Sequence, residues 1–390
     1  MALSVWTPRG LSLTLLFLCA CGGSASASPT VTPSPSEGTP SSAVTPTPTP
    51  AAAPVVLTAI TRSSDGTVAE LHLVRLDGTA VASVAIPDNV WNLYLPVVGR
   101  HAYFVDGDAV RAVAGDGSVT TVGTLTLPNM SSQWSSAVGI AVSPDESQIA
   151  YGYATGINTS ANTYASRVFV EAASGSPHQL IDESTDANGF LLPFAWSTSG
   201  LWVTHTPLGL GGAGPFLNYQ SMNASLVDPL TGAVGPMQTN CRFPNATSVR
   251  PSGAAACIAA PGQPRNIMVT LPHQPTRILP DPAPSLQLGD LTVRADGGLV
   301  ALGTASDNQS SWSYNTIEVG GSAAGTWAAV GPSGTLPVAW IDANRLLVGH
   351  TLGNGPSSAF DGVFLLDATS GAETKIDKDP AALGTLPATG

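Results

Sequence analysis

A strand, a tight polar turn and a second strand recur seven times after Val55, and this repeat constrains the fold more than any other feature of the chain. Most of the turns contain Asp-Gly, Ser-Gly or Thr-Gly, whose glycine supplies the positive φ that a hairpin turn needs. Successive turns are roughly 40 to 60 residues apart, so each repeat is long enough for one unit that packs on its neighbours. The turns lie at Gly78, Gly117, Gly175, Gly232, Pro272–Gln274, Gly321 and Gly371.

A more apolar hairpin precedes most of these turns. In the clearest example, Ala141–Tyr153, an apolar run stops at Ser143-Pro144-Asp145, turns, and resumes as a strand that ends in Tyr-Gly-Tyr. Apolar strands on both sides of a turn are typical of a strand pair that is buried on both faces of its sheet. The related segments are Leu95–Gly107, Pro193–His205, Ala246–Ala260, Leu291–Gly303 and Pro337–His350.

Two hairpins per repeat make a four-stranded antiparallel blade, so the sequence predicts an all-β fold, a seven-bladed β-propeller in residues 55–390. The first repeat lacks an innermost strand, and ring closure therefore needs one from residues 381–390. The expected blades span residues 55–87, 88–127, 128–183, 184–238, 239–280, 281–331 and 332–380.

Composition agrees with this fold class and excludes one class of partner. Only 10% of the residues are charged and 33 are proline, which leaves little material for amphipathic helices. The net charge is -12, and the only lysines are Lys375 and Lys378. The chain has no basic face that could neutralise phosphates, so we do not expect nucleic acid to be a partner.

The first 20 residues have the pattern of a targeting signal. Arg9 supplies a positive charge and Leu11–Leu18 form an apolar segment that is too short to span a bilayer, which needs about 20 residues. Leu18-Cys19-Ala20-Cys21 resembles the lipobox of bacterial lipoproteins, although Cys19 departs from the usual small residue. The resemblance implies that Cys21 is acylated and becomes the mature N-terminus. An ordinary secretory peptide with two incidental cysteines is the alternative.

Residues 21–54 are expected to be the lipidated cysteine followed by a disordered tether. The stretch is rich in Ser, Thr, Ala and Pro, including the run Thr45–Pro50, and it has no apolar periodicity to bury. We therefore expect a protein held by lipid to the outer side of a bacterial cell membrane, or in a related envelope layer.

The segment Val142-Ser143-Pro144-Asp145, followed by the strand Gln148–Tyr151, resembles the repeat of TolB-type β-propellers. Glu146 stands where that family prefers glycine. The resemblance implies blades whose strands run in order from the central channel outward. It also implies a role in binding proteins or glycans at the cell envelope.

Two motifs match well-known signatures, and we interpret both as incidental. Leu386–Gly390 reads LPATG, the sortase recognition sequence, but the apolar segment and basic tail of sortase substrates do not follow it. Gly209–Gly214 satisfies GxGxxG, yet Pro215 and a strand-like segment follow where a phosphate-binding loop requires a helix. A flexible loop is the preferred interpretation.

Cys241 and Cys257 are the two cysteines outside the leader, and an oxidising exterior favours a disulfide between them. A simple register around the turn at Pro251–Gly253 would place Cys257 opposite about Ala246. A bond therefore requires the chain to bend back near Pro244, and two buried free thiols are the alternative.

The candidate binding residues lie where the second strand of an inner hairpin ends and a long polar loop begins. Tyr153, His205 and His350 hold this position in three blades and are expected around one mouth of the channel. Long loops on one face of a repeat protein often form its binding surface. The aromatic residues of these loops are further candidates, although they could instead fold the loops onto the ring: Tyr164, Phe216, Tyr219, Trp312, Tyr314 and Phe360.

Other polar and aromatic residues receive structural interpretations. His205 and His350 come from blades on opposite sides of the ring and have no mapped third ligand, so we predict no metal site and no cofactor. Trp196 and Trp340 each follow alanine in an innermost strand, which indicates repeat packing. Asp182, Glu183 and Asp186 are expected in a solvated turn.

These observations favour a monomeric, membrane-tethered binding or scaffolding protein whose long-loop face takes a protein or glycan of the cell envelope. The sequence contains no HExxH, GxSxG, Walker or CxxC motif and gives no catalytic residue. The alternative is a glycan hydrolase or lyase with carboxylates at the channel mouth, which would require two carboxylates about 5 to 10 Å apart. An envelope assembly factor is a third hypothesis.

Overall fold

The structure is a computed structural model, and the chain divides into a unit of Met1–Thr49 and a unit of Pro50–Gly390. Every residue that the structure describes belongs to the second unit. These residues are 55–61, 68–87, 95–128, 136–158, 163–172, 178–183, 190–206, 223–235, 238, 240–244, 246–260, 263–307, 312–352, 359–378 and 381–386. Cys21 and its tether therefore lie outside the described residues. No helix in the described part is long and apolar enough to cross a membrane.

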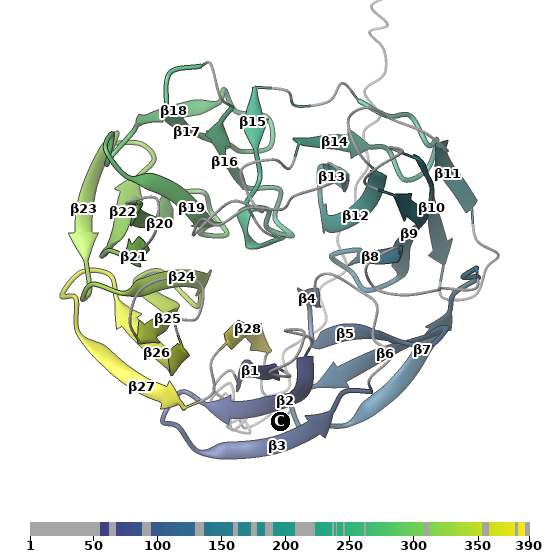
Figure 1. The fold of residues 1–390 in the computed structure, drawn as a ribbon, viewed down its shortest axis with the longest axis horizontal. Helices are drawn as coiled ribbons and strands as arrows, with labels where there is room; N and C mark the ends of the chain where they lie inside the picture. The colour runs from purple at the N-terminus through teal and green to yellow at the C-terminus, as the bar shows by residue number, and fades with distance from the viewer. Residues whose placement is uncertain are drawn as a thin grey trace, which may run out of the picture. The chain divides into compact units, whose positions relative to one another are not determined.

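The described residues form seven antiparallel sheets, numbered here in chain order, and Figure 1 shows them arranged around a common centre. Sheet 1 contains β28 (Ala381–Leu386), β1 (Val55–Thr61), β2 (Val68–Arg75) and β3 (Ala80–Ala85). Sheet 2 contains β4 (Val97–Val98), β5 (His101–Asp106), β6 (Ala109–Ala114) and β7 (Val119–Thr124). Sheet 3 contains β8 (Ser136–Val142), β9 (Gln148–Asn158), β10 (Thr163–Ala172) and β11 (His178–Glu183).

The remaining sheets follow the same inner-to-outer order. Sheet 4 contains β12 (Phe190–Ser197), β13 (Gly200–Thr206) and β14 (Asn223–Val227). Sheet 5 contains β15 (Cys241–Arg242), β16 (Ala255–Ala259), β17 (Asn266–Thr270) and β18 (Arg277–Pro280), with the 3-10 turn η1 (Ala246–Ser248) between its first two strands. Sheet 6 contains β19 (Gln287–Val293), β20 (Leu299–Asp307), β22 (Ile317–Gly321) and β23 (Thr326–Val330), and β21 (Trp312–Tyr314) pairs with β20. Sheet 7 contains β24 (Thr335–Trp340), β25 (Arg345–Leu352), β26 (Ala359–Asp367) and β27 (Glu373–Asp377).

The all-β propeller prediction is confirmed, but the prediction of seven four-stranded blades is wrong. Six sheets have the four-strand order of a blade, whereas sheet 4 has three strands among the described residues. After β14 the chain turns at Asp228 and returns along β14. The described residues of this segment make an isolated bridge between Val227 and Val234, and Gly235 and Gln238 donate their N–H groups to β14 carbonyls, but they form no regular strand. Val234 is 49% exposed, so its side chain adds little buried apolar surface to hold this segment against β14.

Apolar side chains fill the spaces between consecutive sheets and close the ring. Each of seven buried clusters joins one sheet to the next, as where Phe104 of sheet 2 packs with Leu71 and Leu386 of sheet 1. The last cluster joins Leu347 of sheet 7 to Val56 of sheet 1. The core is therefore divided among the interfaces between sheets, as in a propeller.

The innermost strand of sheet 1 comes from the other end of the chain. Strand β28 pairs with β1 from Val55, opposite Leu386, to Ala59, opposite Ala381. This is the strand exchange that ring closure requires. Leu386, the first residue of the LPATG motif, is fully buried in the cluster between sheets 1 and 2, and the rest of the motif lies outside the described residues.

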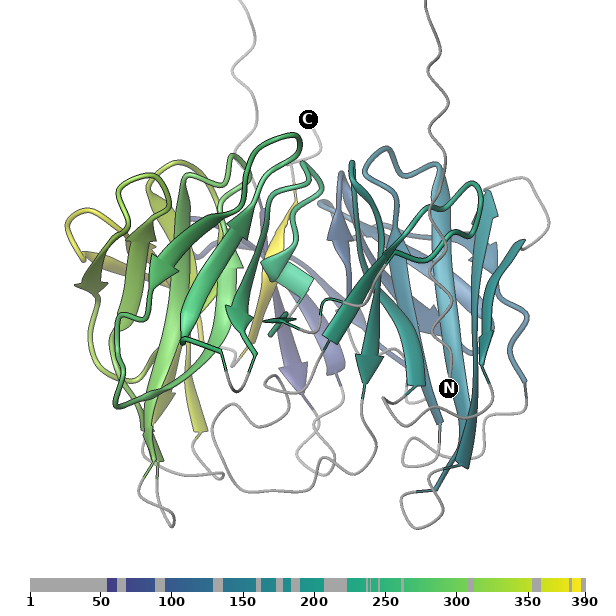
Figure 2. The same cartoon turned by 90° about the horizontal axis from the view of Figure 1, so that it is seen from above.

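The two ends of the ring differ, and we name them by their connections. The tight turns between first and second strands, such as Ser143–Ser147, define the turn end, and the connections that follow the second strands define the loop end. Figure 2 views the sheets edge-on and shows the strands running between these ends. Because Val55 pairs with Leu386 at the start of a second strand, both residues lie at the turn end.

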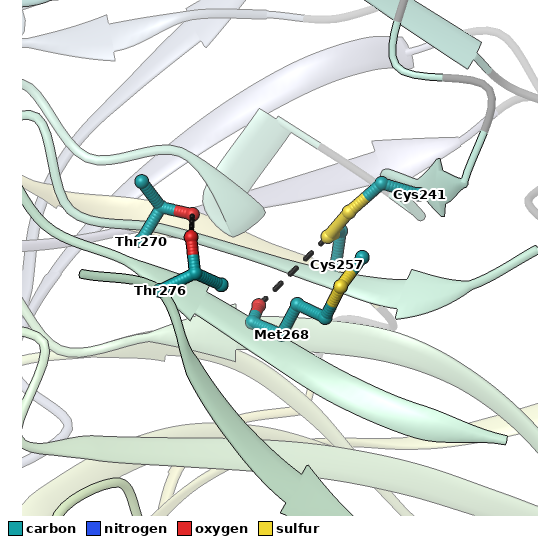
Figure 3. Close-up of a disulfide and its surroundings, with 5 residues drawn as sticks. All are labelled: Cys241, Cys257, Met268, Thr270 and Thr276. Atoms are coloured by element: carbon teal, nitrogen blue, oxygen red, sulfur yellow. Dashed lines mark hydrogen bonds between the residues drawn. A yellow bond between two sulfur atoms is a disulfide. The ribbon is translucent and has the colours of Figure 1, made fainter. Parts of the chain in front are cut away.

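The predicted disulfide between Cys241 and Cys257 is confirmed (Figure 3). Cys241 pairs with Ala259, and the two bridged Cα atoms are 5.6 Å apart, which is an ordinary separation for a disulfide. The 3-10 turn η1 takes up the extra residues before Val249 pairs with Ala255. This is the bend of the chain that the spacing of the two cysteines demands.

Candidate functional site

The turn at Ser143–Ser147 is held by its own side chains. The Ser143 and Ser147 hydroxyls donate to Asp145 Oδ1 at 2.6 and 2.8 Å, and the Ser147 N–H donates to the same atom at 3.1 Å. These hydrogen bonds, that of Ser143 foremost, lower the pKa of Asp145 to about 2. The Ser-Pro-Asp sequence thus explains why the chain reverses here, because a charged Asp145 collects the free donors of the turn.

Glu146 links this turn to the neighbouring sheet. Its backbone has a φ of +59°, a conformation that favours glycine. Its carboxylate accepts the N–H of Arg100 and lies 2.7 Å from His101 Nδ1, so it spans from sheet 3 to sheet 2. Burial and, secondarily, the Glu146 charge raise the pKa of the nearby Tyr103. The departure from glycine at this position therefore has a structural role.

Similar hydrogen bonds connect the turns of sheets 4 to 7. The Thr198 N–H and hydroxyl donate to the carbonyls of Pro251 and Ser252, both at 2.9 Å. Ser252 donates in turn to the Ala295 carbonyl, and Arg294 Nη1 donates to that of Ala343 at 2.6 Å. Hydrogen bonds at the turn end thus join the turns of sheets 2 and 3 and those of sheets 4 to 7 into parts of a rim.

A cavity of about 240 Å³ opens inside this rim, where the innermost strands end. Six of the seven sheets contribute to its wall, through residues that include Val97, Val142, Ala195, Arg250, Ala339 and Thr385. Arg250 is the one ionisable side chain among the described lining residues. Most of the side chains that line the cavity are apolar, about half of its accessible wall is polar, and Arg250 is the single cationic group that the described chain places there.

Asp290, in the innermost strand β19, is a second unusual ionisable residue. It is the extra residue of a bulge in β19, between Gly289 and Leu291, and its φ is +46°. Phe194 and Val338 are the extra residues of corresponding bulges in β12 and β24. Burial raises the pKa of Asp290 to about 7, so the folded state favours the neutral carboxyl at mildly acidic pH.

His205 and His350 lie near the loop end of their second strands, whereas Tyr153 lies in the middle of β9, which continues to Asn158. Tyr153 stacks on Phe169, with ring centroids 6.1 Å apart. His350 Nε2 lies 2.9 Å from Glu373 Oε1, and its ring stacks on Phe364 at 3.9 Å.

His205 also has a partner on the adjacent strand of its own sheet, because its Nε2 lies 3.2 Å from the Ser225 hydroxyl. The structure gives the three side chains structural partners, and their binding role stays a prediction. No group of three or more His, Cys, Asp or Glu side chains in the described ranges could hold a metal ion.

Four of the six aromatic candidates lie in strands that extend beyond the regular blade. Tyr164 is in β10 and Phe360 in β26, while Trp312 and Tyr314 form part of the extra strand β21. Of these, Tyr314 has a described side chain, which packs against the buried Ala305 and Leu336. Phe216, Tyr219 and the Gly209–Gly214 motif lie outside the described residues.

The sequence correctly predicts that Trp196 and Trp340 pack between repeats, but it does not single out Arg250 as a candidate site residue. Trp196 packs between sheets 3 and 4, and Trp340 between sheets 6 and 7. The missed signal is the near identity of two turns, VRPSG at Val249–Gly253 and VRADG at Val293–Gly297. Aligning them shows that only the second has a carboxylate beside its arginine.

Comparisons with known proteins describe the fold. No protein-family model and no curated protein matches the chain. Among solved structures, a chain from a structural analysis of two prolyl endopeptidases matches with 12% identity and a TM-score of 0.48. The match covers 83% of this chain and 49% of that chain. The chain thus spans about half the length of that enzyme.

Two further structures match over most of both chains. The putative TolB from Agrobacterium tumefaciens has 11% identity and a TM-score of 0.35, covering 85% of this chain and 91% of its own. Oligogalacturonate lyase in complex with manganese has 7% identity and a TM-score of 0.38, covering 83% and 85%. These likenesses are at 7–12% identity and concern the fold alone.

Proposed function

We propose that this chain is a lipid-anchored extracytoplasmic binding protein that is acylated at Cys21 and presents its loop end to a protein or glycan of the cell envelope. The observation that supports this most is the opposition of the two ends. Val55, where the expected tether joins the ring, is at the turn end, whereas the connections that follow the second strands leave from the loop end. The loop end therefore points away from the point of attachment.

The second support is the rigidity of the platform beneath the loops. Strands β9 and β10 remain paired as far as Asn158 and Thr163, and β20 and β21 as far as Asp307 and Trp312. Paired strands that extend past the blade hold the loops on a fixed base, which lowers the entropy lost on binding. A scaffold of this kind suits recognition of a large partner.

The anchor is tested by metabolic labelling with an alkyne analogue of palmitate in the native host. We expect the wild-type protein and Cys19→Ser to be labelled and retained in membranes, and Cys21→Ser to lose both the label and membrane retention. Labelling of Cys21→Ser at the wild-type level would contradict the anchor. The outcome bears on the anchor alone.

The loop-end surface is tested with the full chain in envelope preparations after photo-crosslinking. One variant replaces residues 207–222 by a short Gly-Ser linker. The control variant, Asp116→Asn, changes an outer turn instead. We expect the first variant to lose the wild-type crosslinked partner and the control to keep it. Equal crosslinking of both variants would contradict the loop-end assignment.

A glycan hydrolase or lyase is the alternative, and it makes a different prediction. Such an enzyme would release soluble saccharides from purified envelope glycan, whereas a binding protein would co-sediment with the glycan and leave its length unchanged. Chromatography of the released material separates the two functions. Size-exclusion chromatography with light scattering tests the expected monomer.

A further inference from the structure

Two inner turns of neighbouring sheets have nearly the same sequence. Val249–Gly253 reads VRPSG in sheet 5, and Val293–Gly297 reads VRADG in sheet 6. In each turn the closing glycine donates its N–H to the carbonyl of the arginine, at 2.9 and 2.8 Å. Both closing glycines have positive φ, at +91° and +67°. Arg250 and Arg294 therefore occupy the same position of the repeat.

The two arginines differ in how their charge is balanced. Arg294 makes a bidentate ion pair with Asp296, with both N–O distances at 2.7 Å. In the other turn Ser252 stands in the place of Asp296, and its hydroxyl donates to the carbonyl of Ala295. The turn of Arg250 thus lacks the carboxylate that neutralises its counterpart.

No described residue replaces the missing carboxylate. Arg250 makes no side-chain hydrogen bond or ion pair within the described part of the chain, and its Nε is shielded from solvent without an acceptor. A second cavity of about 320 Å³ adjoins it, but the carboxylates there, Asp296 and Asp342, bind Arg294 and Arg345.

Arg250 is partly buried, and this burial lowers the pKa of its guanidinium, as is expected of a cation with no anionic partner among the described residues. An unpaired charge in a poorly solvated site carries a large cost, which a bound counter-charge relieves. The turn end thus holds a cation that is prepared for an anion that the described chain does not supply.

The walls around Arg250 indicate what carries the anion. Phe194, Trp196 and Val142 line the cavity of about 240 Å³ and are almost fully buried. Trp340, which lines the adjoining cavity and is 3% exposed, has an Nε1–H without an acceptor in the described structure. We propose that this turn-end site binds the carboxylate of a ligand with a short apolar body, with the Arg250 guanidinium as the anion partner.

A planar guanidinium matches a carboxylate in a two-point hydrogen bond, and the apolar side chains among the cavity's lining residues can pack against a short aliphatic group. Two sources share this chemistry, the C-terminus of a peptide and a free aliphatic acid. The site is at the end of the ring opposite the loop surface, so this inference does not rest on the proposed function.

The test is isothermal titration calorimetry of the full chain in detergent micelles with three probes. N-acetyl-leucyl-alanine carries the carboxylate, its C-terminal amide has the same shape without the charge, and butyrate represents the free acids. We expect the dipeptide acid to bind at least about tenfold more tightly than its amide, because a charge-assisted pair is lost in the amide. Equal affinity of the acid and the amide would overturn the proposal. So would the absence of any binding of the acid at concentrations up to about 10 mM, which is weaker than most specific affinities.

Ser252→Asp is the decisive variant, because it gives Arg250 the same internal partner that Asp296 gives Arg294. We expect it to fold, since the sister turn already has Asp at this position, and to weaken binding of the dipeptide acid about tenfold or more. Ser118→Asp adds the same charge to an exposed outer turn and should bind like the wild type. Retention of wild-type affinity by Ser252→Asp would contradict the role of Arg250.

Two further measurements complete the test. Arg250→Met removes the cation at similar length and should abolish the preference for acid over amide, whereas a persistent preference would place the carboxylate elsewhere. If butyrate binds as tightly as the dipeptide acid, the natural ligand class is free aliphatic acids; if the dipeptide binds at least tenfold more tightly, it is a peptide C-terminus. Both results retain the carboxylate site.

Discussion

Glu146 shows how one residue can serve two neighbouring sheets at a local conformational cost. Its positive φ disfavours any residue with a Cβ, yet its carboxylate binds the Arg100 N–H and His101 across the interface. We expect Glu146→Ala to lower the free energy of unfolding by on the order of 1–3 kcal/mol, because both bonds are lost. Glu146→Gly loses the same bonds but relaxes the backbone, and should be about 1 kcal/mol more stable than the alanine variant.

Urea unfolding of the three proteins measures these differences. A glycine variant that is less stable than the alanine variant would show that the positive φ costs nothing here. An alanine variant as stable as the wild type would show that the link between sheets is energetically neutral.

Asp290 should make stability depend on pH in a direction that is opposite to that of most carboxylates. Its pKa is raised to about 7 in the folded state from an ordinary value of 3.8, so the folded state binds the proton more tightly than the unfolded state. Stability from this group is present at low pH and is lost as pH rises from about 4 through 7. Asp290→Asn stays neutral, and should therefore gain stability relative to the wild type between pH 5 and pH 8, by on the order of 1–3 kcal/mol.

Thermal unfolding of wild type and Asp290→Asn at both pH values isolates this residue, because the other titrating groups cancel in the difference. A difference between the two proteins that is the same at pH 5 and pH 8 would contradict the buried, neutral carboxyl.

At the scale of the strands, close approach of the sheets depends on glycine. A Cβ on Gly139 of β8 would lie 2.5 Å from the Pro193 carbonyl oxygen of the next sheet. We expect Gly139→Ala to destabilise the fold by about 1–3 kcal/mol, because the backbone of β12 would have to move. Gly123→Ala in β7 is the control, since its new Cβ meets only the Ile149 methyl, at 3.6 Å.

Chemical denaturation should show the control to be neutral or slightly stabilised, because alanine restricts the unfolded chain more than glycine does. Equal loss of stability in both variants would point to a general effect of replacing strand glycines, and would contradict the packing argument.

The strands also show what the sequence could and could not predict. The turn at Ser143–Ser147 could be predicted because its serines and aspartate satisfy one another locally, and the hairpin followed from it. The irregular outer segment of sheet 4 could not, because Ala233-Val234-Gly235 has an acceptable strand pattern, and only the structure shows that Val234 is half-exposed and forms an isolated bridge. Arg250 was overlooked because its significance lies in what Ser252 does not provide, which becomes visible only beside Arg294 and Asp296.

The whole ring depends on one strand contributed from the far end of the chain. Removal of residues 381–390 would leave the inner edge of β1 unpaired and delete Leu386 from the cluster between sheets 1 and 2. Burial of that leucine alone is worth about 1.5–3 kcal/mol, so we expect the truncated protein to lose more than about 3 kcal/mol once the lost strand pairing is included. Removal of residues 387–390 retains Leu386 and is the matched control.

Limited proteolysis and thermal unfolding distinguish the two truncations. We expect the longer deletion to be cut rapidly and to melt at a lower temperature, and the shorter one to behave as the intact chain. A stable ring without β28 would show that the other six interfaces between sheets suffice.

The position of Val55 has a mechanical consequence. The chain enters the ring at a strand that has a hydrogen-bonded neighbour on each side, β28 and β2. A pull on the leading segment along the direction of β1 loads both ladders in shear, so their bonds must yield together instead of opening one at a time. Tension applied through the proposed anchor would therefore be opposed by both ladders of β1 at once.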